Sequence, residues 1–228
     1  MQALASTAGF RVPAAIALRG VVTPLRQPAQ RMPPGQRRFF AKGDEVFVAG
    51  DTATQFFKVV SGTVRTCTLL TDGRRQIEAF HLCGDLFGLE SGHVHRFTAE
   101  AIDNVEVIAF PRAYLTRLVR DNPEFGDEIM NATLASLDRA HSHMVLLGRR
   151  TAQEKIAAFL LDMAQRLAGT DSFEIPMQRA DIADYLGLTI ETVSRTLTQM
   201  ARDGLISLAA AGRTVVLANK EALKRLDS

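Results

Sequence analysis

Residues 177–206 read MQRADIADYLGLTIETVSRTLTQMARDGLI and contain two short amphipathic segments joined at Gly187. The second segment has two contrasting faces at helical spacing. The apolar face, which we expect to lie toward a core, consists of Ile190, Val193, Leu197 and Met200. The opposite face consists of Glu191, Ser194, Arg195 and Thr198. A carboxylate, a hydroxyl and a guanidinium within little more than one turn can read base edges in a DNA major groove. The segment therefore predicts a helix-turn-helix that recognises DNA sequence.

The residues around the turn favour two closely packed helices. Ala183 and Gly187 are small, and Gly187 tolerates the left-handed conformation that often ends a helix. Thr189 is a good N-cap for the second helix. Gln178 is a weaker cap for the first helix, although Asp181 stands at its third position. The alternative interpretation is an ordinary helical hairpin with a solvated polar face.

The sequence after this segment predicts a wing. Two short apolar runs, 205–208 and 214–217, flank a glycine-containing turn and indicate a β-hairpin. A hairpin directly after a recognition helix is typical of a winged helix. Arg213 would stand at the wing tip, where its cation could meet a phosphate. Residues Lys220–Leu226 predict a short terminal helix.

The motif resembles a known family of regulators. Residues 191–195, Glu-Thr-Val-Ser-Arg, match the E-x-x-S-R pattern of the FNR branch of the CRP/FNR transcription regulators, and residues 181–189 are also typical of that branch. The similarity covers roughly residues 40–226 and is greatest to the FixK-type regulators of nitrogen fixation and microaerobic metabolism. The resemblance implies a transcription activator, not an enzyme, that binds inverted repeats of TTGAT-type half-sites.

The same resemblance assigns roles to individual side chains. Arg195 would donate two hydrogen bonds to guanine, Glu191 would accept one from cytosine N4, and Ser194 completes the base-reading set. Each such contact contributes about 1–3 kcal/mol of discrimination. The residues expected to contact the DNA backbone or flank the site are Arg179, Thr189, Thr192, Thr198 and Arg213. Residues 151–228 hold nine bases and ten acids, so binding would depend on locally placed cations and helix N-termini.

The N-terminal part differs from the rest in composition. Residues 1–38 contain five prolines and no clear amphipathic period, which predicts a flexible basic tail. Residues 1–43 carry seven Lys or Arg and no acid, a composition that also occurs in organellar transit peptides. A flexible extension of a bacterial protein is the preferred interpretation.

Residues 39–122 predict a β domain. Short apolar runs alternate with glycines, three of which, Gly62, Gly73 and Gly84, are eleven residues apart. Asp72-Gly73 between two apolar runs is a hairpin signal, and regular strand-and-turn spacing suggests a barrel or sandwich. The resemblance implies a double-stranded β-helix jelly roll of the cyclic-nucleotide-binding type. The predicted fold class is thus α+β.

The sets of residues that bind a cyclic nucleotide or an iron–sulfur cluster in this family are incomplete in this sequence. Arg96 is followed by Phe97 where a cyclic-nucleotide pocket has an Arg-Ser pair. An iron–sulfur cluster needs four thiolates, whereas the chain has two cysteines, and Ile108 occupies the position of the fourth FNR ligand. We therefore expect neither cofactor. The two cysteines, Cys67 and Cys83, exclude a disulfide framework and suit a reducing cytoplasm, although their redox sensitivity stays open.

His93 and His95 are a third possible ligand set. A pair two residues apart could bind a metal, or one histidine could bind haem. The preferred interpretation is that both are solvated on a polar surface turn. The resemblance to FixK-type regulators implies a regulator without a bound cofactor whose own abundance is controlled upstream. The alternative function is a ligand-gated sensor whose β domain binds haem, a metal or a nucleotide.

Residues 123–150 predict a long helix that joins the two domains. A heptad seam of alternating four- and three-residue steps runs along it through Met130, Leu134, Leu137, His141 and Met144. Such a seam favours pairing with a second copy, and two recognition helices about 34–36 Å apart match one DNA turn. A single helix packed on the barrel is the alternative. Thr151 and Glu154 form a capping box that would begin the DNA-binding domain, 151–228.

The remaining expectations concern partners. In FNR-like activators the β-hairpin loop takes part in contact with RNA polymerase, and here that loop contains Arg74 and Arg75. An ordinary solvated turn is the alternative. No apolar run is long enough to span a membrane. Because the two cysteines suit a reducing compartment, we expect a cytoplasmic protein. The expected partners are double-stranded DNA, RNA polymerase and a second copy of the chain.

Overall fold

The computed structural model describes residues 35–149, 151–167, 171–209 and 213–227. The tail predicted for residues 1–38 lies outside this part of the chain, apart from its last residues, where the first strand already begins at Gln36. Within the described ranges, no helix is long and apolar enough to cross a membrane.

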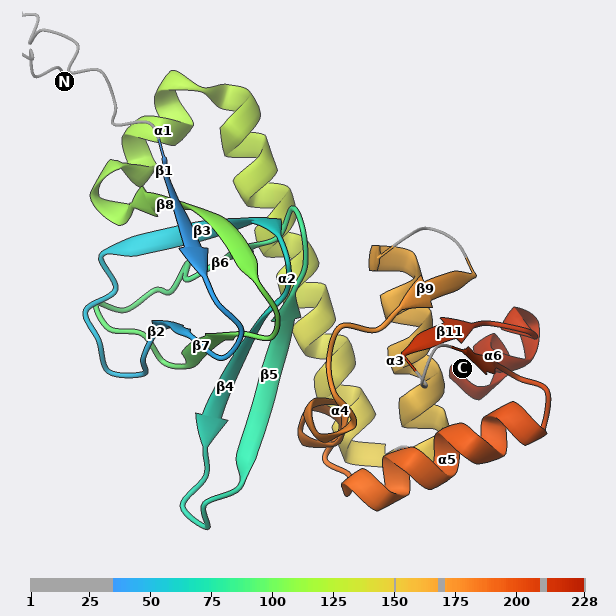
Figure 1. The fold of residues 1–228 in the computed structure, drawn as a ribbon. Coiled ribbons are helices and arrows are strands. Elements are labelled where there is room, and N and C mark those ends of the chain that lie inside the picture. Colours follow the sequence, from blue (N-terminus) through green and yellow to red (C-terminus); the bar gives the residue numbers. More distant parts are fainter. Residues whose placement is uncertain (1–34, 150, 168–170, 210–212, 228) are drawn as a thin grey trace, which may run out of the picture. The chain divides into compact units, whose positions relative to one another are not determined.

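Two four-stranded antiparallel sheets form the N-terminal domain (Figure 1). One sheet has the order β1-β8-β3-β6 and the other the order β2-β7-β4-β5. The strands are β1 (Gln36–Phe40), β2 (Glu45–Phe47), β3 (Gln55–Ser61), β4 (Val64–Leu69), β5 (Arg75–His81), β6 (Leu86–Phe87), β7 (Thr98–Ala101) and β8 (Val105–Pro111). The predicted α+β fold with an N-terminal β domain is thereby confirmed.

The interior of the β domain is aromatic. Phe47, Phe57 and Phe87 stack with ring centroids 5.2–6.0 Å apart. Every second residue from Val105 to Ala109 in β8 is buried and adds to this core, together with buried residues of β3, β4 and β7. The predicted hairpin joins β4 to β5. Its turn needs Gly73, because the backbone there has a φ of +82°, which side chains with a Cβ rarely adopt.

A buried histidine forms part of a polar chain within this domain. His81 lies 3.1 Å from the Thr66 hydroxyl, which donates to Glu78 at 2.7 Å. The hydroxyl has one proton, so His81 Nε2–H donates to it. Burial lowers the pKa of His81 to about 4, although the charge of Asp85 acts in the opposite direction and those of Arg166 and Arg139 in the same direction.

This buried histidine makes stability depend on pH. Above the unfolded pKa of about 6.5, His81 is neutral in both states; below it, only the unfolded chain takes up the proton, so the free energy of unfolding falls as pH falls toward 4. We expect a loss of about 2 kcal/mol between about pH 7.5 and about pH 5, measured by urea unfolding. Glu78, whose pKa burial raises, acts oppositely, so the quantity to measure is the difference between wild type and His81→Gln. Equal slopes for the two proteins would contradict the prediction.

A helical segment follows the β domain. It comprises η1 (Arg112–Tyr114), α1 (Leu115–Asp121) and α2 (Pro123–Arg149). The start of α2 packs on the β domain, where Phe125 and Ile129 contact a cluster around Phe56 and Leu118. Farther along, most of its apolar side chains are exposed.

The C-terminal domain is a winged helix. Its elements are α3 (Ala152–Leu167), β9 (Ser172–Glu174), α4 (Arg179–Leu186), α5 (Ile190–Arg202), β10 (Ser207–Ala209), β11 (Thr214–Val216) and α6 (Lys220–Asp227). The capping box at the start of α3 is confirmed, since Thr151 N donates to Glu154 Oε2 at 2.8 Å and Glu154 N to Thr151 Oγ1 at 3.3 Å. The predicted hairpin is the pair β10–β11, and β9, which the sequence did not indicate, adds a third strand.

Candidate nucleic-acid interface

The turn between α4 and α5 has the predicted geometry. Gly187 ends α4 in the left-handed region, with φ +62° and ψ +43°. Thr189 caps α5, because its hydroxyl accepts a hydrogen bond from Thr192 N at 3.2 Å. The two helices thus have the arrangement of a helix-turn-helix.

One face of α5 lies in the core. Val193, Leu197 and Met200 are buried among residues of α3 and α4. Ile190 was expected in the same set, but 48% of it is exposed. Ile190 is the first residue of α5, directly after the turn, and at this end of the helix its side chain lies beyond the core. The predicted apolar face is therefore correct from its second member onward.

The opposite face is open to solvent. Glu191, Ser194, Arg195 and Thr198 are all exposed, and we call them the reading face. A shallow surface hollow of about 560 Å³ is lined by Glu191, Ser194, Arg195, Thr196, Thr198, Gln199 and Arg202. Gln199 was not predicted, although it stands four residues after Arg195 and hence on the same side of the helix. Its amide donates to Asp203 at 2.8 Å.

The reading face carries both signs of charge. The backbone N–H of Glu191 itself and the Thr189 hydroxyl hold the pKa of the Glu191 carboxyl below its usual value, and nearby Arg195 acts in the same direction. Glu191 is therefore an anionic acceptor, and Arg195 beside it is a cationic donor. The Thr198 hydroxyl donates to Ser194 O at 2.9 Å, so its remaining capacity is as an acceptor.

The predicted flanking residues occupy different environments. The hydroxyls of Thr189 and Thr192 lie 3.1 Å apart at the start of α5. The Arg213 side chain is 72% exposed beside the wing, 3.7 Å from Glu174, whereas the tip at 210–212 lies outside the described residues. Arg179 is half-buried, and burial lowers the pKa of its guanidinium. Arg213 is thus more accessible to a phosphate than Arg179.

The two candidate histidine ligands are in different surroundings. His95 is buried and stacks on Phe47 with ring centroids 3.6 Å apart, so the expectation that it is solvated is wrong. Its Nδ1 lies 3.1 Å from Glu90 Oε1. His93 is exposed, as expected. Sequence could not separate them, because the burial depends on a strand 48 residues away. Among the described residues, no group of three or more His, Cys, Asp or Glu could hold a metal.

The segment around these histidines is held by its own side chains. Glu90 accepts from Arg96 N at 2.6 Å, while Arg112 donates to Gly92 O at 2.8 Å and also to the carbonyls of Ala53 and Glu90. These groups already have partners within the chain.

The two cysteines also differ. Cys67 is buried in β4, and burial raises the pKa of its thiol. Cys83 is exposed in the turn after β5 and donates to Val60 O at 3.0 Å. A raised pKa reduces the thiolate fraction and hence the reactivity of Cys67.

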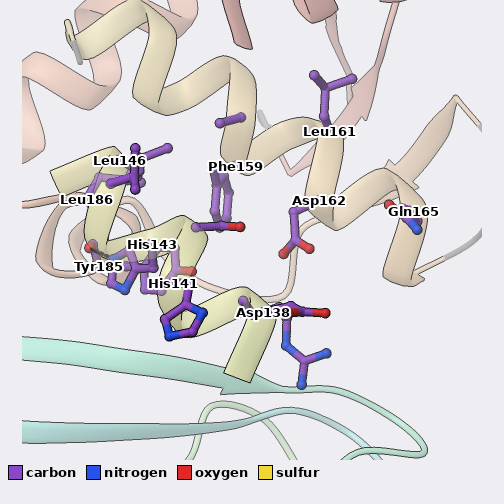
Figure 2. A pocket seen from close by; sticks show the side chains of 14 residues that line it. Asp138, His141, His143, Leu146, Phe159, Leu161, Asp162, Gln165, Tyr185 and Leu186 are labelled. Atoms are coloured by element: carbon purple, nitrogen blue, oxygen red, sulfur yellow. Dashed lines mark hydrogen bonds between the residues drawn. The ribbon is translucent and has the colours of Figure 1, made fainter. Parts of the chain in front are cut away.

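The predicted seam on α2 is exposed. Met130, Leu134, Leu137 and Met144 are 50–65% exposed, and His141 is exposed as well. Val145 and Leu147 extend the exposed apolar surface beyond the predicted set. Between α2, α3 and α4 lies a cavity of about 620 Å³, bordered by Asp138, His141, His143, Phe159, Asp162, Tyr185 and others (Figure 2).

The hairpin arginines have unlike partners. Arg74 lies in the turn with its side chain 77% exposed and pairs with Asp72 at 2.7 Å. Arg75 is only 25% exposed and pairs with Asp181 and Asp184 of α4 at 2.7 and 2.8 Å. Only Arg74 of the two is freely accessible at the hairpin tip.

Comparison with known proteins supports both domains. Residues 37–122 match the model of the cyclic nucleotide-binding domain, and residues 154–226 match the Crp-like helix-turn-helix domain. The chain is 46% identical to the nitrogen fixation regulation protein FixK of Azorhizobium caulinodans over 85% of this chain and 80% of that protein. It is 45% identical to the protein of the same name from Bradyrhizobium diazoefficiens over 78% and 77%. The structure of FixK2 from Bradyrhizobium japonicum superimposes with a TM-score of 0.79 at 43% identity, covering 85% of this chain and 98% of that one.

Proposed function

The chain belongs to the CRP/FNR family of transcription regulators, and we propose that it activates transcription as a homodimer bound to inverted repeats of TTGAT-type half-sites. As a member of this family it is a DNA-binding regulator and not an enzyme. The observation that carries the proposal is the reading face of α5, which exposes Glu191, Ser194 and Arg195 together on one side of a helix whose other side is buried.

Each residue of the reading face has a role in this proposal. Arg195 donates two hydrogen bonds to a guanine, Glu191 accepts from cytosine N4, and Ser194 contacts a neighbouring base. The contacts to phosphate and sugar come from Arg179, Thr189, Thr192, Thr198 and Arg213. These contacts fix the register of α5 in the groove without specifying sequence.

The homodimer is proposed from the seam on α2. Contiguous exposed apolar surface of this extent is uncommon on monomeric proteins and marks interaction sites. Leu134 and Leu137 lie at its centre, at the spacing of a coiled coil. In this proposal the β domain comprises residues 36–122, because β1 begins at Gln36, inside the tail predicted for residues 1–38. Residues 123–150 form the dimerisation helix and 151–228 the DNA-binding domain. Two DNA-binding domains would then face two half-sites of an inverted repeat.

We further propose that the regulator acts without an iron–sulfur cluster or cyclic nucleotide. The absence of a serine after Arg96, the presence of only two cysteines, and the internal pairing of Glu90 and Arg112 support this part of the proposal. The similarity to proteins named for nitrogen fixation regulation supports a role in nitrogen-fixation or microaerobic control.

Purified protein tests the proposal directly. Fluorescence anisotropy is measured with a duplex that carries the TTGAT inverted repeat and with a scrambled duplex of the same composition. We expect the colourless, metal-free protein to prefer the repeat at least about 1,000-fold at fixed salt. Equal affinity for both duplexes would reject it. Visible absorbance or stoichiometric metal, with DNA affinity that follows occupancy, would instead favour a ligand-gated sensor.

Contact with RNA polymerase is proposed for the hairpin tip, through Arg74. We expect Arg74→Glu to reduce transcription from a target promoter severalfold in a reconstituted assay while the affinity for the DNA site is unchanged, because Arg74 pairs only within its own turn among the described contacts. Arg75→Glu cannot make this test, since its ion pairs to α4 would be broken as well. Unchanged promoter output for Arg74→Glu would discard this contact.

A further inference from the structure

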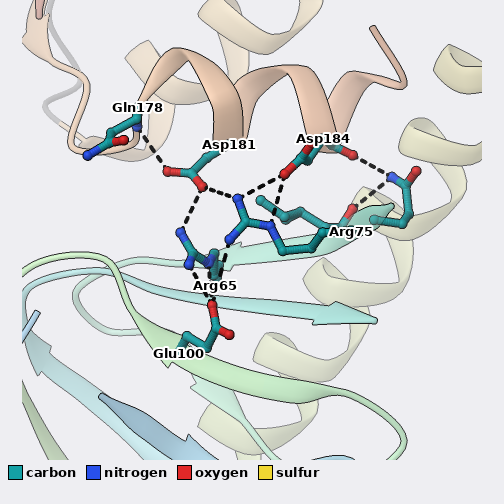
Figure 3. A network of polar contacts seen from close by, with 8 residues as sticks. Arg65, Arg75, Glu100, Gln178, Asp181 and Asp184 are labelled. Atoms are coloured by element: carbon teal, nitrogen blue, oxygen red, sulfur yellow. Dashed lines mark hydrogen bonds and ion pairs between the residues drawn. The ribbon is translucent and has the colours of Figure 1, made fainter. Parts of the chain in front are cut away.

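Helix α4 is held by side chains of the β domain through a group of polar contacts (Figure 3). Arg65 Nη1 and Arg75 Nη2 each lie 2.7 Å from Asp181 Oδ1, and Arg75 Nε donates to Asp184 Oδ2 at 2.9 Å. Gln76 Nε2 donates to Asp184 O at 2.8 Å. We call Arg65, Arg75, Gln76, Asp181 and Asp184 the clasp.

Further hydrogen bonds fix the orientation of the side chains in the clasp. The Asp181 side chain is only 5% exposed, and its second oxygen accepts from Gln178 N at 3.0 Å, so one carboxylate both caps α4 and anchors it to the β domain. Glu100 of β7 accepts from Arg65 Nε at 2.7 Å and orients that guanidinium from the other side. Planar guanidinium forks of this kind restrict direction as well as distance.

The far end of α4 is held by two other helices. The last carbonyls of a helix have no partner within it. Here Tyr185 O accepts from His143 Nε2 of α2 at 2.7 Å, and Leu186 O accepts from the buried Lys155 Nζ of α3 at 3.1 Å. Lys155 also donates to Leu147 O of α2 at 3.3 Å. Helix α4 is thus fixed at both ends to elements outside the helix-turn-helix.

Fixing α4 also fixes the reading face. Leu186 of α4 and Val193 and Leu197 of α5 share one core, and the turn at Gly187 leaves little freedom between the helices. The clasp does not cover the reading face, because Glu191 and Arg195 are exposed while the clasp is formed. It therefore orients α5 and does not mask it.

We propose that the clasp sets the orientation of the recognition helix relative to the β domain and α2, and that its residues determine which separation of half-sites the dimer accepts. The inference rests on the proposed dimer. In a dimer joined through α2, a rotation of each DNA-binding domain changes the distance between the two reading faces, which has to match one DNA turn. Partly buried ion pairs add little net stability, whereas they favour one geometry over others, and that is the property this role requires.

The test compares two neighbouring arginines of the hairpin. Arg75→Glu places a carboxylate against Asp181 and Asp184, whereas Arg74→Glu makes the same change of charge outside the clasp. Affinity is measured for the inverted repeat at its natural spacing and with one base pair inserted between the half-sites. For wild type and Arg74→Glu, we expect the insertion to cost at least about tenfold in affinity.

For Arg75→Glu we expect the natural site to bind about tenfold more weakly and the two spacings to differ by no more than about threefold. The exchange variant with Arg75→Glu and Asp184→Arg restores an ion pair across the interface and should restore most of the preference. A variant that is merely unstable would lose affinity for both sites and keep their ratio. An unchanged ratio in Arg75→Glu overturns the proposal.

A measurement without DNA separates this inference from the proposed function. Failure of the wild type to prefer the TTGAT repeat would reject the function but would leave the clasp to be tested by calorimetry. We expect Arg75→Glu to unfold at a lower temperature than Arg74→Glu, because it places a carboxylate beside the buried Asp181 and beside Asp184. Equal unfolding temperatures for the two variants overturn the clasp as a contact between α4 and the β domain.

Discussion

Arg195→Ala is expected to remove the preference for guanine within each half-site. Arg195 is exposed at the centre of the reading face, and each bidentate contact to guanine contributes about 1–3 kcal/mol of discrimination. Because a dimer makes the contact twice, the loss of about 2–6 kcal/mol should lower affinity for the inverted repeat by about 30-fold or more. Anisotropy with the natural duplex and with duplexes substituted at single guanines measures both quantities.

Arg213→Ala provides the contrast. Arg213 stands beside the wing, and in the proposed complex it meets phosphate, so its removal should weaken binding to all sequences alike. The slope of log affinity against log salt should fall by about 1 for each phosphate that the protein no longer neutralises. A variant Arg195→Ala that behaves in this second way, with its base preference intact, would show that α5 does not read guanine through this residue.

The second large effect is expected at the seam. Leu134→Glu together with Leu137→Glu places four carboxylates in the proposed dimer interface in place of four leucines. Burial of each leucine contributes about 1.5–3 kcal/mol, so self-association should weaken by at least about 100-fold. Sedimentation equilibrium measures the association, and affinity for the full inverted repeat should fall toward that for one half-site.

Ser136→Glu is the matched control for the seam. It adds a carboxylate to the same exposed stretch of α2 but lies off the seam, so its dimer should persist. A double leucine variant that remains dimeric at the concentration of the wild type would assign this apolar surface to another contact. Circular dichroism checks that the total helix content is the same in both variants as in the wild type.

Much of the fold follows from local sequence patterns. The spacing of apolar residues and the glycine at 187 were sufficient for α4 and α5, and Asp72-Gly73 was sufficient for the β4–β5 hairpin, because a turn or one helix face is decided by residues near in sequence. The wing was predicted from two strands, whereas β9 was not. A three-residue strand that pairs with β11 has no distinctive pattern of its own.

The contacts that join distant segments could not be predicted. Asp181 was predicted to stand at the third position of the first helix, where its carboxylate does accept a hydrogen bond from Gln178 N. Its two arginine partners come from β4 and β5, more than 100 residues earlier. Arg75 follows Arg74 in sequence and has the same chemistry, yet only the structure shows that one is paired with α4 and the other exposed. His95 likewise looked like a surface residue until its packing against Phe47 was known.

The β4–β5 hairpin consequently faces two different surroundings. Arg74 at its tip is exposed, whereas Arg75 beside it pairs with α4. When RNA polymerase binds the hairpin tip and DNA binds α5, the proposed contacts link the two binding events through β5, whose Arg75 pairs with α4. Reciprocity then requires that whatever factor the duplex adds to affinity at the tip, the protein at the tip adds to affinity for the duplex.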